Sequence, residues 1–294
     1  MRRLRRLSDL FGSTSGAIGA GLVLAVVLIA LIGPLVAPYS PTSFVNASFA
    51  PPSADNWLGS DSLGRDVLSR LLCGGYRILG LAAAATALGV FTGAVVGIVA
   101  GYVGRIVDEV TMRIVDVAMA FPQIILVLLF ISVIGPKLWL LTIMVAAVHA
   151  PQVARVARAA TLRIAQEDFV RFAEAIGTPL HRIVLAELLP NITAPLMVEC
   201  GLRFAYSIAL IAGLNFLGFG VQPPAADWGL MINENRIGLM SNPWPVLAPV
   251  ILIAIITIGM NLLTDALART RLGHGVEQGP EPVAEAGAAG AGSA

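Results

Sequence analysis

Long apolar runs separated by shorter polar stretches dominate the chain from residue 17 onward. A helix needs about 20 mainly apolar residues to cross the hydrocarbon core of a bilayer. The pattern therefore predicts an all-α integral membrane fold with six transmembrane helices. The predicted spans cover residues 17–37, 78–101, 114–135, 138–157, 196–217 and 246–267.

Two of these spans contain residues that are unusual in membrane helices. Arg113, Asp116 and Pro122 interrupt the third span, and His149 and Pro151 interrupt the fourth. Membrane helices tolerate proline where neighbouring helices satisfy the freed backbone groups. We therefore predict that both segments still cross the membrane.

Glycine recurs every four residues on the second predicted span, at Gly89, Gly93, Gly97 and Gly101. This spacing places the four glycines on one helical face, and small residues let membrane helices approach closely. The stripe predicts a tightly packed neighbouring helix. The alternative is a glycine-rich helix with no particular partner.

Composition supports a membrane location. Only 13% of the 294 residues are charged and 57% are hydrophobic, whereas a soluble domain carries about 25% charged residues. The net charge of +1 gives no reason to expect nucleic acid as a partner. Cys73, expected in a loop, and Cys200 have no metal-binding spacing, so we expect both to be structural.

Basic residues predict the orientation, because lysine and arginine concentrate on the cytoplasmic side. The first apolar run is longer than the about 7–15 residues of a signal peptide, which indicates an uncleaved anchor. Both termini are predicted to be cytoplasmic. The residues placed inside are Arg2, Arg3, Arg5, Arg6, Arg105, Arg113, Arg155, Arg158, Arg163, Arg171, Arg182, Arg269 and Arg271, and those placed outside are Arg65, Arg70, Arg77, Lys137 and Arg236.

The predicted organisation is a cytoplasmic segment 1–16, a membrane domain 17–271 and a tail 272–294. The composition of the tail predicts disorder. Within the membrane domain, three polar stretches connect the spans. They are an outer segment 38–77, an inner loop 158–195 and an outer loop 218–245.

The inner loop carries the sharpest pattern. Its apolar residues fall at helical spacing on one face: Phe169, Phe172, Ala173, Ile176 and Leu180. Gly177 is expected to end the first helix, Thr178 to N-cap a second one, and Pro190 to stop that helix before the fifth span.

The loop is thus predicted to be two short helices joined by a Gly-Thr-Pro elbow. Phe172 and Ile176 are expected to pack beneath the elbow. The loop is either an amphipathic hairpin resting on the membrane or a docking element for a cytoplasmic partner. A DNA-reading helix-turn-helix has the same local pattern, but the membrane tether argues against it.

The outer stretches contain aromatic and charged residues. Residues 51–77 are expected to form an amphipathic helix along the outer interface, with Trp57 at headgroup depth. In the second outer loop, Gln222, Pro223 and Trp228 are candidate outer-gate residues.

Charged residues inside the spans are candidate functional residues. Glu199 and Arg203 lie four apart, in the order that favours a helical ion pair. They either line a cavity or form a self-neutralised pair inside the bundle. Asp116 is expected to pair with Arg113.

Motifs of known catalytic sites are missing from the sequence. No G-x-x-x-x-G-K-[ST], H-E-x-x-H or G-x-S-x-G pattern occurs, and no metal site is expected. The chain is predicted not to be an enzyme and to contain no cofactor. If transport through it is driven by ATP, another chain must hydrolyse the ATP.

Several segments resemble a known family. The EAA loop of ABC-importer permeases is matched by Ala173-Glu174-Ala175-Ile176-Gly177 and Leu189-Pro190-Asn191. Other stretches are similar to the C-type permeases of dipeptide, oligopeptide and nickel importers. They include Trp57-Leu58-Gly59-Ser60-Asp61, Gly64-Arg65-Asp66-Val67-Leu68-Ser69-Arg70, Ala120-Phe121-Pro122, Asn215-Phe216-Leu217-Gly218-Phe219-Gly220 and Asn242-Pro243-Trp244.

The resemblance implies a type I ABC-importer permease in a bacterial cytoplasmic membrane. It implies a second, B-type permease as heterodimer partner, two ATPase subunits or domains that use ATP and Mg, an extracytoplasmic substrate-binding protein, and surrounding lipids. The implied cargo is peptide, with dipeptides first; longer peptides, nickel chelates and haem-like cargo also fit. The implied contacts with the ATPase are Arg171, Ala173, Glu174, Ala175, Gly177 and Leu180.

The sequence departs from the family pattern at charged positions. Arg171 stands where the family usually has glutamate, Glu187 replaces a frequent histidine, and Ile211 replaces a frequent acidic residue. Two other classes stay open at this point: an ion-coupled secondary transporter and a non-transport membrane scaffold. Internal repeats and mid-membrane ion ligands would favour the former, and we find no convincing repeat.

Overall fold

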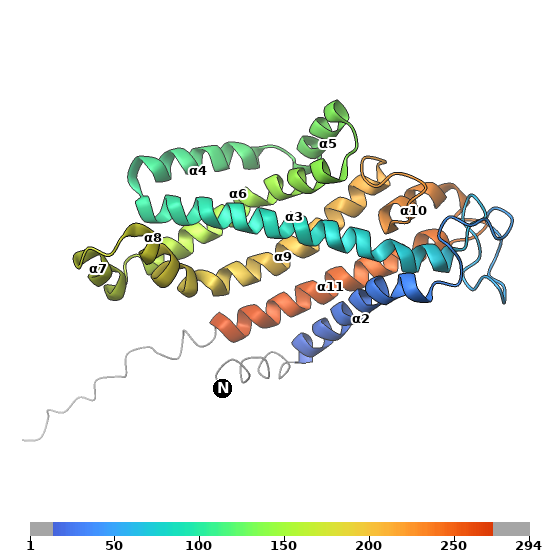
Figure 1. Ribbon diagram of the computed structural model, residues 1–294, viewed down its shortest axis with the longest axis horizontal. Coiled ribbons are helices and arrows are strands. Elements are labelled where there is room, and N and C mark those ends of the chain that lie inside the picture. The colour runs from blue at the N-terminus through green and yellow to red at the C-terminus, as the bar shows by residue number, and fades with distance from the viewer. Residues whose placement is uncertain (1–13, 273–294) are drawn as a thin grey trace, which may run out of the picture.

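The computed structural model describes residues 14–272, with side chains up to Arg269. Helices form an elongated bundle (Figure 1). Their bounds are α2 Thr14–Val36, α3 Val67–Val103, α4 Arg105–Ala120, α5 Gln123–Ile134, α6 Leu138–Ile164, α7 Asp168–Ala175, α8 Leu180–Arg182, η1 Ile183–Leu188, α9 Leu189–Phe216, α10 Trp228–Asn235, η2 Arg236–Gly238 and α11 Trp244–Leu272.

The bundle has two distinct ends, which we name for what they carry. The elbow end carries residues 165–182, and the loop end carries residues 37–66 and 217–243. Figure 1 shows that the described chain begins and finishes toward the elbow end. Residues 1–13 of the predicted cytoplasmic segment 1–16 lie outside the described residues, as do residues 273–294 of the predicted tail 272–294.

Within residues 14–272, five helices are long and apolar enough to cross a membrane: Thr14–Val36, Val67–Val103, Leu138–Ile164, Leu180–Phe216 and Trp244–Arg269. The predicted third span is instead a pair of helices, α4 and α5, bent by 83°. The expected count of six holds only if this pair is one span. The all-helical, multi-pass prediction is confirmed for the described part of the chain.

The bend between α4 and α5 has a local cause. Pro122 restricts the residue before it to extended backbone, and Phe121 has φ −83° and ψ 134°. A helix cannot continue through that conformation, so α4 ends there. The predicted span over 114–135 is therefore broken at Pro122, the proline that was expected to interrupt it.

The glycine stripe on α3 packs against α6, as predicted. A Cβ atom built at Gly93 would lie 2.5 Å from the Ala150 carbonyl oxygen, and one at Gly97 would lie 2.3 Å from that of Ala154. Gly89 and Gly101 similarly face the Ala146 and Arg158 carbonyls. The two helices therefore approach backbone to backbone along four turns.

The outer segment does not form the predicted amphipathic helix. Residues 37–66 are irregular, and α3 begins at Val67. Gly59 and Gly64 have φ of 71° and 79°, which interrupts any helix. Asp66 caps α3 by accepting a hydrogen bond from the Ser69 amide, so Cys73 lies in a helix rather than in the expected loop.

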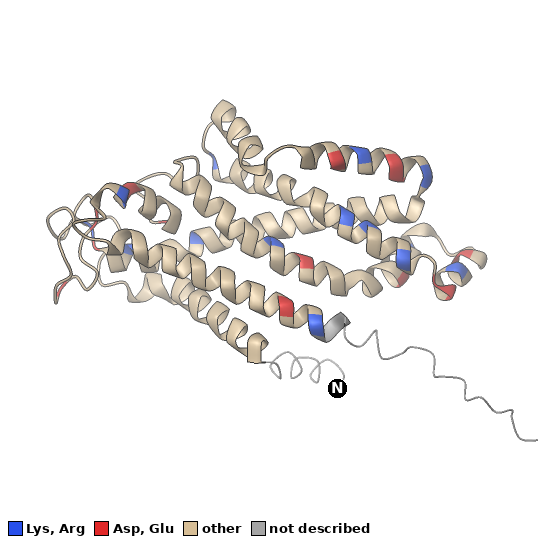
Figure 2. Cartoon of the chain, turned by 180° about the vertical axis from the view of Figure 1, so that it is seen from behind, with Lys and Arg blue, Asp and Glu red and all other residues tan. Residues whose placement is uncertain are grey.

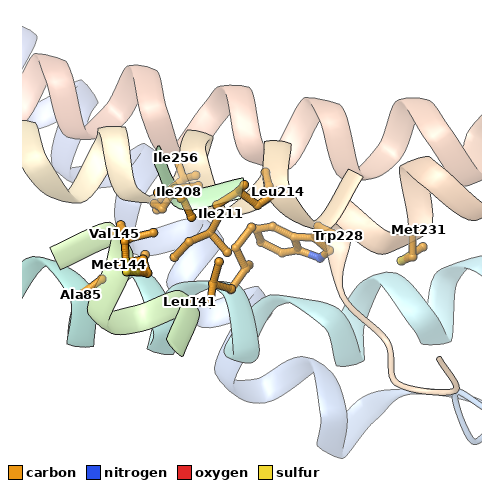
Figure 3. Close-up of a cluster of buried hydrophobic side chains, with 14 of the residues drawn as sticks. Ala85, Leu141, Met144, Val145, Ile208, Ile211, Leu214, Trp228, Met231 and Ile256 are labelled. Carbon is orange, nitrogen blue, oxygen red and sulfur yellow. The ribbon is translucent and has the colours of Figure 1, made fainter. Parts of the chain in front are cut away.

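Apolar side chains fill the bundle between its ends. Trp228, Leu141, Ile208 and Ile211 are fully buried in one cluster (Figure 3). Charged residues gather toward both ends of the bundle and along α4, and few lie in the middle of the other helices (Figure 2). This distribution suits a body surrounded by lipid.

Candidate functional site

The elbow is built by a helix ending that the sequence predicted. Gly177 follows α7 with φ 76°. Its amide donates to the Glu174 carbonyl at 3.0 Å, and the Thr178 amide donates to the Ala173 carbonyl at 3.0 Å. These two bonds make the Schellman arrangement, which satisfies the last carbonyls of the helix.

Two other predictions about the elbow were wrong. Pro179, not Thr178, is the N-cap residue of α8, and no side chain caps that helix. Pro190 does not stop the helix, because α8, η1 and α9 run on as one segment from Leu180 to Phe216. The Leu189 amide donates to the Val184 carbonyl, five residues back, and this π-type turn accommodates the proline that follows.

A second apolar core lies beneath the elbow. Val170 and Ala173 of α7 are buried against Ile183 and Leu188 of η1. The same cluster includes residues of the three long helices: Ala94, Ile98, Val153, Ala157, Ile192 and Leu196. The elbow is thus packed against α3, α6 and α9 together.

Phe172 and Ile176 do not belong to this core. Their exposed fractions are 67% and 65%, which contradicts the expectation that they pack beneath the elbow. With Leu180, also exposed, they form an apolar surface beside a groove between α7 and η1 that Asp168 and Arg182 border.

One hydrogen bond fastens α7 to the end of α3. The Tyr102 hydroxyl donates to Glu174 Oε1 at 2.6 Å. Of the expected contact residues, Arg171, Glu174, Ala175, Gly177 and Leu180 are exposed and Ala173 is buried. The structure therefore brings five of the six to the surface of one elbow.

Ion pairs attach α4 to α6 at the elbow end. Asp116 pairs with Arg155 at 2.5 Å rather than with Arg113, because α4 lies along α6. Both side chains of this pair are exposed, at 55% and 48%. Asp108, about two turns earlier on α4, pairs with Arg158 of α6. Asp116 therefore lies on the surface of this subunit.

The predicted pair on α9 is formed. Arg203 Nε lies 2.8 Å from Glu199 Oε1, and both side chains are largely buried. Arg203 Nη1 also donates to Gln152 Oε1 on α6. Gln152 was missed in the sequence, where a single glutamine next to Pro151 gives no signal.

The candidate gate residues have different surroundings. Gln222 and Pro223 are exposed. The side-chain Nε2 of Gln222 donates to the carbonyls of Gly218 and Gly220 at 3.0 Å each. Trp228 is fully buried and its Nε1 donates to the Leu71 carbonyl at 2.8 Å. Trp228 is therefore a core residue at the start of α10 and does not line an opening.

Asp227 fixes the beginning of α10. Its Oδ1 accepts hydrogen bonds from the Gly229 and Leu230 amides and from Asn215 Nδ2. Burial raises the pKa of this carboxyl to about 6 despite these bonds. The first turn of α10 is thus held in place by buried hydrogen bonds at the loop end.

Sequence reasoning also missed a buried charge cluster at the loop end. Glu234 Oε2 accepts from Arg65 Nη2 and Arg70 Nη2, each at 2.8 Å. Asp61 Oδ2 accepts from Arg65 Nε at 2.6 Å. The mixed charges of residues 61–70 were visible in the sequence, but nothing in the sequence indicated that Glu234 would pair with them.

The arrangement is an apolar helical body with an exposed, well-fastened elbow at one end. Residues 93–272, which include the elbow, match the family described as the binding-protein-dependent transport system inner membrane component. The chain belongs to this family. It is an ABC-importer inner-membrane permease of the C type.

Two relatives align with this permease along most of their length. The dipeptide transport system permease protein of Alkalihalophilus pseudofirmus is 34% identical over 85% of this chain and 83% of the relative. The di/tripeptide transport system permease protein of Pseudomonas aeruginosa is 34% identical over 90% of both chains.

A solved structure shares the fold. The inward-facing MetNI methionine ABC transporter superposes with a TM-score of 0.50 at 22% identity, covering 67% of this chain and 96% of that one. The permease thus has the type I ABC-importer fold that its sequence predicted. Within residues 14–272, no three His, Cys, Asp or Glu residues lie together as metal ligands would.

Proposed function

We propose that this permease conducts peptides, dipeptides first among them, across the cytoplasmic membrane, together with a second permease subunit. Two separate ATPase subunits or domains use ATP and Mg and drive transport through the elbow. An external binding protein delivers the peptide to the loop end. Both termini and the elbow then lie on the cytoplasmic side.

The packing of the elbow is the observation that carries this proposal. A force applied at α7 moves the bundle only if the elbow does not yield. The apolar core beneath it, the Schellman ending at Gly177 and the Tyr102–Glu174 bond all resist such yielding. The exposed apolar side chains of Phe172 and Ile176 provide a surface that an ATPase subunit would bury.

The peptide cargo rests on the relatives. Two relatives with about a third of their residues in common with this chain are called dipeptide and di/tripeptide permeases. The two alignments cover 85% and 90% of this chain, so they extend well beyond the elbow.

Gly177 provides the test of coupling. Its φ of 76° is unfavourable for a β-branched residue, and a Cβ there meets nothing within 4 Å. In the assembled importer, Gly177→Val should change the elbow backbone without a clash. We expect peptide uptake per ATP hydrolysed to fall several-fold while membrane insertion is retained.

Gly135 provides the matched control. It also has positive φ, 96°, and open space around a Cβ, but it lies between α5 and α6, far from the elbow. Gly135→Val should leave uptake per ATP unchanged. Equal uptake per ATP in wild type and Gly177→Val would refute the coupling role, and failure of the wild-type importer to take up any peptide would refute the cargo.

A further inference from the structure

Polar side chains of α6 and α9 lie within the membrane-spanning bundle where these two helices contact each other. They are His149, Gln152, Glu199, Arg203 and Tyr206, which we call the α6–α9 polar cluster. Charged residues inside membrane spans are costly, and they commonly mark the path of a substrate or ion. Coupling through the elbow makes no use of this cluster.

The charges of the cluster cancel. Arg203 Nε is 2.8 Å from Glu199 Oε1, and Arg203 Nη1 donates to Gln152 Oε1. The guanidinium is therefore held between a carboxylate on its own helix and an amide on the neighbouring one. A pair of this kind brings no net charge into the membrane.

The cluster reaches the surface of the subunit at Tyr206. The Tyr206 side chain is 57% exposed, and the Arg203 guanidinium carbon lies 5.0 Å from the centre of its ring. Arg203 itself retains 13% exposure of its side chain. The ion pair thus lies directly beneath an exposed aromatic side chain.

His149 adds unused hydrogen-bonding capacity. Its side chain is 1% exposed, and neither ring nitrogen has a hydrogen-bond partner among the described residues. It precedes Gln152 by one turn of α6 and lies within electrostatic range of Arg203. Buried polar atoms in folded proteins almost always have partners, so the two ring nitrogens have hydrogen-bonding capacity that no described residue uses.

Toward the loop end, the cluster gives way to purely apolar packing. Met144 and Val145 follow on α6, and Ile208 and Ile211 follow on α9 (Figure 3). Residues 138–148 of α6 and 204–216 of α9 contain no Asp, Glu, Lys or Arg. The cluster is the place where charged ends of a substrate are best accommodated.

We propose that the α6–α9 polar cluster transiently binds both charged ends of a zwitterionic peptide during its passage. This inference rests on the proposed peptide cargo. The peptide ammonium takes the place of Arg203 at Glu199, and the peptide carboxylate takes the place of Glu199 at Arg203. One ion pair is exchanged for two, and the site stays neutral throughout.

The test uses the complete importer with its binding protein in proteoliposomes, with labelled dialanine as the probe. Glu199→Gln/Arg203→Gln removes both charges and keeps similar shape and hydrogen bonding. We expect dialanine uptake to fall at least about tenfold, as loss of a charge-assisted bond implies, while ATP hydrolysis stimulated by the loaded binding protein persists. The control Asp116→Asn/Arg155→Gln neutralises an exposed pair and should leave uptake unchanged.

The single variants test whether the cluster recognises charge on the peptide. If the pair had only a structural role, the ratio of uptake between two oppositely charged dipeptides would not change. Glu199→Gln should raise the uptake ratio of alanyl-glutamate to alanyl-lysine, and Arg203→Gln should lower it, each by about tenfold. The binding protein is the same throughout, so its own preference cancels. If a single variant fails to assemble, the double variant still decides the question.

Two results would overturn the inference: undiminished dialanine uptake by the double variant, or unchanged ratios in assembled single variants. Absence of uptake by the wild type is a different result. It would show that the peptide cargo itself was wrongly assigned.

Discussion

The hydroxyl of Tyr102 lies 2.6 Å from Oε1 of Glu174 and joins the last turn of α3 to α7. The two residues are 72 positions apart in the chain. Glu174 lies in the segment that resembles the EAA loop of ABC-importer permeases, whereas Tyr102 lies on α3, one of the long apolar helices. The bond therefore connects the surface proposed to face the ATPase directly to a span.

Removing this bond should loosen α7. We expect Tyr102→Phe to lower the local stability of α7 by about 1 kcal/mol, the usual net value of one hydrogen bond. Faster hydrogen–deuterium exchange of amides 168–176 would show it. Tyr39→Phe is the control, because the Tyr39 hydroxyl makes only a 3.4 Å contact at the loop end. Unchanged exchange in Tyr102→Phe would mean that the apolar core alone holds the helix.

The contact between α3 and α6 should tolerate no added side chain. Gly97→Ala places a methyl group 2.3 Å from the Ala154 carbonyl oxygen. We expect it to destabilise the protein by about 1–3 kcal/mol through overpacking, seen as a lower melting temperature in detergent. Gly80→Ala on the same helix meets nothing within 4 Å and should not lower it. Equal melting temperatures would contradict the close packing.

The buried charge cluster at the loop end should depend on Glu234. In Glu234→Gln, Arg65 and Arg70 keep a single carboxylate partner, Asp61, which they share. We expect a loss of about 3–5 kcal/mol in stability, because each buried arginine loses a charged partner. Protease should then cut residues 37–66 more rapidly. The control is Arg236→Gln, which changes an exposed residue paired with Asn233. Protease should cut this variant at the wild-type rate.

Asp227 should give the loop end a measurable pH dependence. Its pKa is about 6 in the folded protein, above the ordinary 3.8, so the folded state binds the proton more readily. Stability should therefore increase as the pH falls from 7 to 5. Relative to Asp227→Asn, the wild type should gain about 1 kcal/mol over this interval. Chemical unfolding at both pH values measures the difference, and a constant difference would show that Asp227 is ionised throughout.

Much of the architecture was predictable because it depends on local rules. The length of apolar runs predicted the spans, the period of four in Gly89–Gly101 predicted the α3–α6 contact, and Gly177 predicted the end of α7. Each of these signals lies within a few turns of chain. Predictions from local patterns of this kind are the most reliable ones that a sequence allows.

The failures arose where a distant partner decides the structure. Residues 51–77 have an amphipathic pattern, but Arg65 and Arg70 turn inward to reach Glu234, more than 160 positions away. Asp116 pairs across to Arg155 because α4 lies on α6. The sequence contains these residues but not their proximity.

Pro190 misled for a related reason. A proline normally ends or kinks a helix, yet η1 absorbs it and the helix continues from Leu180 to Phe216. This segment has 37 residues and so extends about 55 Å at 1.5 Å per residue. Tilting it by about 5° from the elbow would displace its far tip by about 5 Å over that length, so a small angular change at the elbow is enough to shift the loop end, where we propose that the peptide is delivered.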